Sequence, residues 1–296
     1  KGFERKRLFI RTLKRSNLHI TMIEQLNETK AFLKEQGIEK VDIGITLGTG
    51  LGDLVNHVKI IKTIDYAVIP HFPVSTVEFH KGQLLYAELN TTKLLIMQGR
   101  FHLYEGYSMQ QITYPIRLMK MLGAQALLLS NAAGGINKDF KKGDLVVIDD
   151  HINLQGSSPL IGTNDDSLGS RFPDMSCPYS PELNKLLYKA ASELGVSLNT
   201  GVYASVSGPN LETRAEYRYL GRIGADIVGM STVPEVIVAN HMNLPCAAVS
   251  VVTDECDPLH LKPVNIAEII EVAGRSDKAL SQIFINTIRS ITLNKK

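Results

Sequence analysis

Short apolar runs separated by stretches of helical spacing restrict the fold of this chain more than any other feature. The runs are rich in Val, Ile and Leu, which is typical of strands buried on both faces of a sheet. Residues 180–194 show the clearest helical pattern, because Ser180 can cap its start, Pro181 suits its first turn and Gly195 follows its end. The predicted strands are Val41–Leu47, Leu94–Met97, Ala126–Leu129, Leu145–Ile148, Val202–Val206, Asp226–Val228 and Cys246–Val252, and further helices are expected at 23–37 and 212–220.

This alternation predicts an α/β fold, with a mixed central sheet flanked by helices. No Pro-, Gly- or Ser-rich linker divides the chain and no internal repeat is visible, so we expect a single domain over residues 22–296. Residues 1–21 differ, because they hold seven basic side chains and one acid, a net charge of +6. We interpret this segment as an upstream or non-native leader that ends before Met22; an Arg-rich targeting peptide and a basic arm for nucleic acid are the alternatives.

The rest of the chain carries a net charge of −4, since the whole sequence carries +2, and this excludes a body built to bind polyanions such as nucleic acid. No apolar run approaches the roughly 20 residues that a membrane-spanning helix needs. The three cysteines, Cys177, Cys246 and Cys256, are odd in number and lack metal-ligand spacing. We therefore expect a cytoplasmic protein without disulfides and without a metal site.

Most of the apolar runs end in glycine and polar residues. In α/β sheets, ligands bind beyond the carboxyl ends of the strands, so we expect these segments to converge on one site. The turn at residues 48–52 lacks the glycine spacing of a dinucleotide fingerprint, since Asp53 occupies the sixth position, but its backbone N–H groups and the Thr49 hydroxyl could hold a single anion. Arg100 and His102 could bind the same anion; the alternatives are a tight turn that binds nothing and a surface arginine beside a structural histidine.

Several longer motifs in this order resemble the trimeric purine nucleoside phosphorylases, over essentially residues 30–290. Each motif is weak alone, and their order along the chain makes the resemblance specific. They are Met97–Tyr107, Asn131–Ile136, Gly143-Asp144 with Asp150–Leu154, Arg171–Pro173, Gly208-Pro209 with Glu212-Thr213, and Gly229–Val236.

The resemblance implies phosphorolysis of purine nucleosides, with inorganic phosphate as co-substrate and without a cofactor. It implies a homotrimer in which Phe172 completes the site of a neighbouring subunit. The phosphate-binding residues that it implies are Thr49, Arg100, His102, Ala132 through its backbone, and Ser231. The nucleoside-binding residues are His80, Tyr104, Phe172, Tyr203, Leu211, Glu212, Val228, Met230, Asp254 and Ile266. The residues with a catalytic role are His102, Glu212 and Asp254.

Three positions depart from the commonest family pattern. Asp254 replaces an asparagine, Leu211 a phenylalanine over the base, and Ile266 a histidine for the 5′-hydroxyl. An ionised Asp254 can only accept hydrogen bonds, which suits a 6-amino group, whereas Glu212 suits the N1–H of a 6-oxopurine. Protonation of Asp254 beside another carboxylate would reconcile them, so we expect a preference for inosine and guanosine. The alternatives are a 5′-methylthioadenosine or adenosine phosphorylase and a non-catalytic nucleoside-binding sensor.

Overall fold

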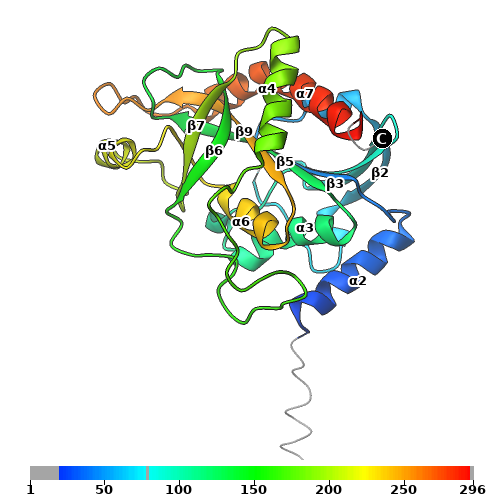
Figure 1. Cartoon of the computed structure of the whole chain (residues 1–296). Helices are drawn as coiled ribbons and strands as arrows, with labels where there is room; N and C mark the ends of the chain where they lie inside the picture. The colour runs from blue at the N-terminus through cyan, green and yellow to red at the C-terminus, as the bar shows by residue number, and fades with distance from the viewer. Residues whose placement is uncertain (1–19, 78–79, 294–296) are drawn as a thin grey trace, which may run out of the picture.

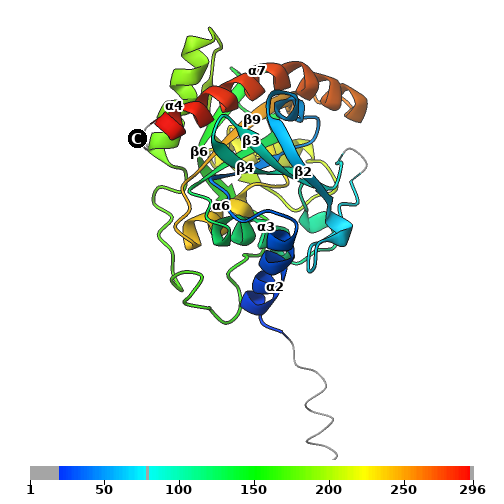
Figure 2. The same cartoon turned by 90° about the vertical axis from the view of Figure 1, so that its right-hand side faces the viewer.

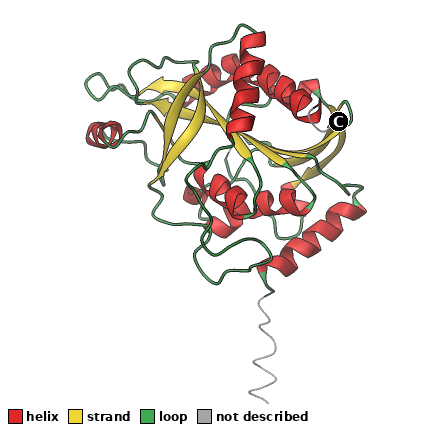
Figure 3. Ribbon diagram, in the orientation of Figure 1, coloured by secondary structure: helices red, strands yellow, loops and turns green. Residues whose placement is uncertain are grey.

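The computed structural model describes residues 20–77 and 80–293 and places one large β-sheet between two groups of helices (Figures 1 and 3). The strand order is β2-β3-β4-β1-β5-β8-β7-β6-β9. The strands are β1 (Ile43–Leu47), β2 (Lys59–Asp65), β3 (Gln83–Leu89), β4 (Thr92–Gln98), β5 (Ala126–Gly135), β6 (Leu145–Asn153), β7 (Asn199–Ser205), β8 (Ile227–Gly229) and β9 (Cys246–Glu255).

Part of the sheet closes on itself. β9 pairs with β6 in antiparallel fashion and with β5 in parallel fashion, so β5, β8, β7, β6 and β9 form a ring of hydrogen-bonded strands. β1, β4, β3 and β2 extend from β5 as an open sheet. The sheet is mixed, since β1 and β4 run parallel to one another whereas β5 and β8 run antiparallel.

The helices cover both faces of the sheet. α4 packs on α7 on one face, and α3 packs on both α6 and α2 on the other (Figures 1 and 2). α5 lies at one edge of the molecule (Figure 1). The α-helices are α2 (Met22–Glu35), α3 (Met109–Met121), α4 (Pro181–Glu193), α5 (Arg214–Arg222), α6 (Val233–His241) and α7 (Ile266–Leu293), and the short 3-10 helices are η1 (Asp53–His57), η2 (Tyr66–Val68) and η3 (Leu103–Glu105).

The apolar runs are continuous because their side chains alternate between two cores. In β5, Leu127 and Leu129 pack into the core under α2, α3 and α6, and Leu128 packs into the core under α4 and α7. Successive side chains of a strand point to opposite faces, so a strand covered on both sides needs apolar residues throughout. This confirms the single α/β architecture with a mixed sheet.

All the strands expected from the apolar runs are present, and the Ser180 cap is confirmed by its bond from the Leu183 N–H. Two strands were missed: β2 is exposed and largely polar, and β3 lies beside it. The helix expected at 212–220 begins later, at Arg214, because Thr213 is its cap.

The interpretation of residues 1–21 as a leader stays a prediction, because residues 1–19 lie outside the described residues. Thr21 is the N-cap of α2 and forms a capping box with Glu24. Within residues 20–77 and 80–293, no helix is long and apolar enough to cross a membrane. The three cysteines are free thiols.

Candidate active site

Most of the residues expected at the site lie around one cavity of about 170 Å³. They reach it from the ends of several strands: Thr49 follows β1, Arg100 follows β4, Ser231 follows β8 and Asp254 belongs to β9. The expected residues that line the cavity are Thr49, Arg100, His102, Tyr104, Ala132, Leu211, Glu212, Val228, Met230, Ser231 and Asp254.

β5 carries the backbone of this site. Thr46 of β1 lies opposite Leu129 of β5, so the last five residues of β5 extend beyond the end of β1 and form one wall of the cavity. The sequence analysis ended this strand at Leu129, and that was too early, because residues 131–135 remain in the ladder with β8 and β9. Their small side chains leave the strand backbone open to a ligand.

Arg100 is the buried cation of the site. Its side chain is 3% exposed, its Nη1 donates to the Ser130 carbonyl at 2.7 Å, and its Nε lies 3.3 Å from Oε2 of Glu235. Its Nη2 is buried without a protein hydrogen-bond partner among the described residues. A buried guanidinium with a free N–H group at a cavity wall is suited to an anion that supplies the missing acceptor.

His102 is held by a carboxylate. Its Nδ1 lies 2.9 Å from Oε1 of Glu105, and Glu105 also accepts hydrogen bonds from the Thr76 N–H at 2.9 Å and the Thr76 hydroxyl at 2.6 Å. Burial lowers the pKa of His102. A neutral His102 that donates through Nδ1 keeps Nε2 as an acceptor, which can receive the proton of a monoanionic phosphate.

Glu105 makes stability depend on pH. Burial would raise its pKa from 4.5, but hydrogen bonds from His102 and Thr76 outweigh this and lower the pKa to about 2. A lowered carboxyl pKa stabilises the fold above the unfolded value, and this stabilisation is lost as pH falls from about 4.5 towards 2. We expect Glu105→Gln to lower the urea midpoint at pH 7 and to lose most of that effect at pH 3. Glu193→Gln, in an exposed pair with Lys189, is the control and should change little at either pH.

His80 connects Thr49 to the Arg100 loop. Its Nε2 lies 3.1 Å from the Thr49 hydroxyl and its Nδ1 lies 3.1 Å from the Arg100 carbonyl. Its ring stacks on His102, which stacks on Tyr104. Burial lowers the pKa of His80 to about 4, so at neutral pH it is an uncharged positioning group behind the cavity wall.

Ser231 is placed by the turn that starts α6. Its N–H donates to the Tyr203 hydroxyl at 3.3 Å. The following Thr232 has a φ of 70°, a rare conformation for a β-branched residue, and Asn131 donates a hydrogen bond of 2.9 Å to its hydroxyl. Thr232 is the N-cap residue of α6, and Ser231 before it lines the cavity.

Asp277 of α7 anchors the glycine-rich turn that carries Thr49. Its Oδ2 accepts the N–H groups of Gly52 and Asp53, both at 2.6 Å. The turn leads into the 3-10 helix η1. A single buried carboxylate thus satisfies two backbone donors at the start of η1.

We expect Asp277→Ala to raise the KM for phosphate about tenfold, because loss of these hydrogen bonds, at about 1 kcal/mol each, loosens the turn that carries Thr49. Asp277→Asn keeps one oxygen that can accept both N–H groups and should stay close to the parent enzyme. Steady-state phosphate titrations of the two variants test this anchor, and an unchanged KM in Asp277→Ala would exclude it.

Two carboxylates, Glu212 and Asp254, share the cavity with Tyr217. Oδ1 of Asp254 accepts from the Thr253 hydroxyl at 3.0 Å, and its Oδ2 accepts from the Cys256 thiol at 3.1 Å. Burial raises the pKa of Glu212, and the nearby Asp254 adds to this rise. Such a pair recognises donors on a planar heterocycle.

Four expected residues do not line the cavity. His80 and Tyr203 lie behind it and act through Thr49 and Ser231. Phe172 is 85% exposed and lies under the Arg171 guanidinium, away from the cavity of its own chain. Ile266 is 50% exposed at the start of α7, and Ile269, one turn later, lines the cavity instead.

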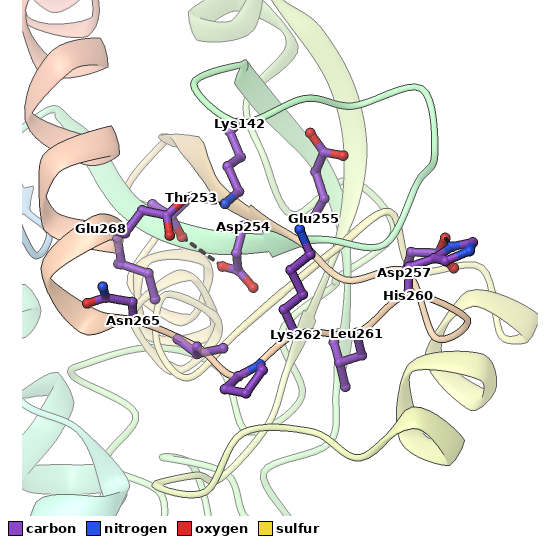
Figure 4. Close-up of a pocket in the computed structure, with 13 residues that line it drawn as sticks. Lys142, Thr253, Asp254, Glu255, Asp257, His260, Leu261, Lys262, Asn265 and Glu268 are labelled. Atoms are coloured by element: carbon purple, nitrogen blue, oxygen red, sulfur yellow. Dashed lines mark hydrogen bonds and ion pairs between the residues drawn. The ribbon is translucent and has the colours of Figure 1, made fainter.

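The sequence analysis missed some lining residues. Asn131 and Thr253 lie next to residues that the sequence analysis named, Ala132 and Asp254. Tyr217 and Ile269 lie on helix faces that only the packing reveals. A second cavity, of about 450 Å³, shares Thr253, Asp254 and Ile269 with the first, and Figure 4 shows the Thr253–Asp254 hydrogen bond on its wall. Within the described part of the chain, no group of three or more His, Cys, Asp or Glu side chains could hold a metal ion.

Comparison with known proteins agrees with this geometry. Residues 42–289 match the family model of the phosphorylase superfamily. The chain is 46% identical over 254 residues to purine nucleoside phosphorylase 1 of Bacillus subtilis, covering 86% of this chain and 94% of that protein. It is 40% identical to the purine nucleoside phosphorylase of Mus musculus, covering 91% and 96%.

Solved structures show the same fold. The purine nucleoside phosphorylase of Schistosoma mansoni in complex with adenosine superposes with a TM-score of 0.86 at 39% identity, covering 91% of this chain and 98% of that chain. A schistosome purine nucleoside phosphorylase in complex with hypoxanthine gives a TM-score of 0.85 at 38% identity, with the same coverage. The chain belongs to the purine nucleoside phosphorylases of the phosphorylase superfamily.

Proposed function

We propose that this protein uses inorganic phosphate to cleave the bond between a purine base and ribose, releasing the free base and ribose 1-phosphate. The observation that carries the proposal is the buried Arg100, which lines the same cavity as Thr49, His102 and Ser231 and whose Nη2 has no hydrogen-bond partner in the described part of the chain. The two carboxylates that suit a purine lie in that cavity as well. Substrates with an anion and a heterocycle therefore fit together in one site.

The proposed chemistry needs only these side chains and the phosphate. Cleavage passes through a ribose with positive charge at C1′, and a phosphate held by Arg100, Thr49, Ser231 and the Ala132 N–H stabilises that charge and attacks C1′. The departing base gathers negative charge, which a proton or hydrogen bond at N7 disperses. Tyr104 and Met230 would contact the ribose, which lies between the phosphate and the base.

We propose that inosine and guanosine are preferred over adenosine. Glu212 as a carboxylate accepts from N1–H, which 6-oxopurines carry and adenine lacks. Asp254 opposes this preference when it is ionised, because it faces the 6-position as a pure acceptor. Base release from inosine, guanosine, adenosine and 5′-methylthioadenosine with phosphate present tests both the reaction and the base preference. Equal turnover of inosine and adenosine would contradict the preference, and cleavage of the adenine nucleosides alone would replace it with the 5′-methylthioadenosine or adenosine alternative.

Asp254→Asn should sharpen the preference. An asparagine amide can donate to O6, so we expect the ratio of kcat/KM for inosine to that for adenosine to rise about tenfold, the value of one good hydrogen bond. Asp257→Asn, on the exposed loop beyond β9, is a matched control that should leave the ratio unchanged. A ratio that falls in Asp254→Asn would show that Asp254 does not face the 6-position.

We further propose that the protein works as a homotrimer in the cytoplasm. The exposed Phe172, a large apolar side chain without a partner pocket in its own chain, supports a role in a neighbouring site. Sedimentation equilibrium measures the mass of the assembly, which we expect to be three times the mass of one chain. Mixing Phe172→Ala with Arg100→Ala subunits should restore activity in part, because a mixed trimer contains intact combinations of the two positions. No recovery on mixing would contradict the shared site.

A further inference from the structure

Behind the base end of the cavity, four titratable side chains form one connected chain. Tyr217 lines the cavity together with Glu212 and packs in one buried cluster with Cys256, and its hydroxyl interacts with both side chains. The Cys256 thiol in turn donates to Oδ2 of Asp254 at 3.1 Å. Tyr217 and Cys256 are 3% and 1% exposed. Neither residue belongs to the motifs that indicated the family.

The number of protons that these four side chains share decides their net charge. There are three contacts, Glu212–Tyr217, Tyr217–Cys256 and Cys256–Asp254, and each needs one hydrogen. The hydroxyl and the thiol supply two hydrogens, so one contact stays unmade while both carboxylates are ionised. A third proton on either carboxyl group completes all three contacts. An unmade contact between buried polar groups is unfavourable, so the geometry favours three protons and one negative charge.

The surrounding charges favour the same state. Glu216 and Asp254 both raise the pKa of Glu212, after the larger effect of burial. Lys142 attracts Asp254 and Glu255, but its Nζ is paired with Glu268 at 2.5 Å. The thiol of Cys256 has a pKa raised by burial and by Asp254, so it stays protonated and acts as a donor. The tyrosine pKa is raised by burial as well.

We infer that Tyr217 and Cys256 form a proton relay that moves one negative charge between Glu212 and Asp254, according to the purine that is bound. In one state the protons lie on Glu212, Tyr217 and Cys256, and Asp254 is ionised. In the other, Glu212 has passed its proton to the Tyr217 oxygen, Tyr217 its proton to the Cys256 sulfur, and Cys256 its proton to Asp254. No proton is gained or lost, and only the site of the charge changes.

The two states suit different bases. An ionised Glu212 accepts from the N1–H of a 6-oxopurine, and a neutral Asp254 does not repel its O6. An ionised Asp254 accepts from the 6-amino group of adenine, and a neutral Glu212 does not repel its N1. The relay thus makes one pocket complementary to both classes. This inference rests on the proposed function, since it concerns the base end of the same site.

Two single variants should shift the preference in opposite directions. Cys256→Ala leaves the Tyr217 hydroxyl with Glu212 as its acceptor, which holds the charge on Glu212; we expect kcat/KM for adenosine to fall about tenfold relative to inosine. Tyr217→Phe leaves the thiol donating to Asp254, which holds the charge on Asp254. We expect kcat/KM for inosine to fall about tenfold relative to adenosine in this variant. Cys256→Ser keeps a group that donates and accepts, and should keep the parent ratio.

These outcomes separate the relay from a structural role. A residue that only packs would lower both substrates together in each variant, and such parallel losses, or equal shifts in one direction, would overturn the relay. A parent enzyme that cleaves neither nucleoside with phosphate present overturns the proposed function and the relay with it. A parent enzyme that cleaves one of the two alone keeps the function and overturns the relay. Opposite shifts with serine rescue are the expected result.

Discussion

Arg100→Ala should lower kcat/KM for phosphate about a thousandfold while the protein stays folded. Arg100 is buried with Glu235, which also accepts from the Thr232 N–H at 3.1 Å, and its Nη2 is the free donor at the cavity. Removing the guanidinium takes away the charge-assisted contacts with phosphate in the transition state, an effect of about 4 kcal/mol on kcat/KM. That free energy corresponds to the expected factor. Removing the guanidinium also leaves Glu235 as an uncompensated buried anion, which lowers the stability of the fold.

The comparison for Arg100→Ala is Arg117→Ala. Arg117 is also a buried arginine and donates to Nδ1 of His241 at 3.2 Å, but it lies between α3 and α6 and does not line the cavity. We expect Arg117→Ala to lower the melting temperature and to leave the KM for phosphate unchanged. Double replacement of Arg100 by Ala and Glu235 by Gln should regain stability but not phosphate affinity. Normal phosphate kinetics in Arg100→Ala would remove the anion site from this cavity.

Glu212→Ala should lower kcat/KM for inosine about a hundredfold and leave the KM for phosphate unchanged. Glu212 lies at the base end of the cavity, half-buried, where a carboxylate accepts from N1–H as negative charge develops on the departing purine. A hydrogen bond to a charged group is worth about 3 kcal/mol, which corresponds to this factor.

Glu216→Ala is the matched control, because Glu216 lies four residues after Glu212, in the first turn of α5, and its carboxylate caps the helix by accepting from the Thr213 N–H at 2.7 Å. It should affect stability only, by the usual 0.5–2 kcal/mol (roughly) of a cap. Equal losses in both variants would mean that α5 itself, and not the Glu212 carboxylate, supports turnover. A loss in the phosphate kinetics of Arg100→Ala and a loss in the inosine kinetics alone of Glu212→Ala would thus assign the two residues to opposite ends of the cavity.

The fold was predictable where the sequence carries a periodic signal. Continuous apolar runs such as 246–252 identify strands that are covered on both faces, and the cap and proline at 180–181 identify the start of α4. β2 was not predictable in the same way, because only Ile64 of its seven residues is buried. The strand predicted at 126–129 ended too early, because the small residues after Asn131 carry no apolar signal although the long partner β9 keeps them in the sheet.

The site was predictable where it lies at strand ends. Thr49, Arg100 and Asp254 meet because the parallel strands β1, β4 and β9 bring their carboxyl ends to one edge. Ser231 joins them because β8 runs antiparallel to the end of β5 and leads back beside Asn131. Contacts that join distant parts of the chain left no signal in the sequence. Asp277 lies more than 220 positions from the turn that it anchors. Tyr217 and Cys256 come together only in the buried cluster that residues of α5 form with the segment after β9.

The requirement for phosphate tests the proposed function most directly. Inosine is incubated with the enzyme with and without inorganic phosphate, and hypoxanthine, ribose and ribose 1-phosphate are quantified. Because Arg100, Thr49 and Ser231 line one cavity and suit an anion, we expect hypoxanthine and ribose 1-phosphate in equal amounts, and none without phosphate. Hypoxanthine released with free ribose, at the same rate in the absence of phosphate, would contradict phosphorolysis and indicate a hydrolase on this fold.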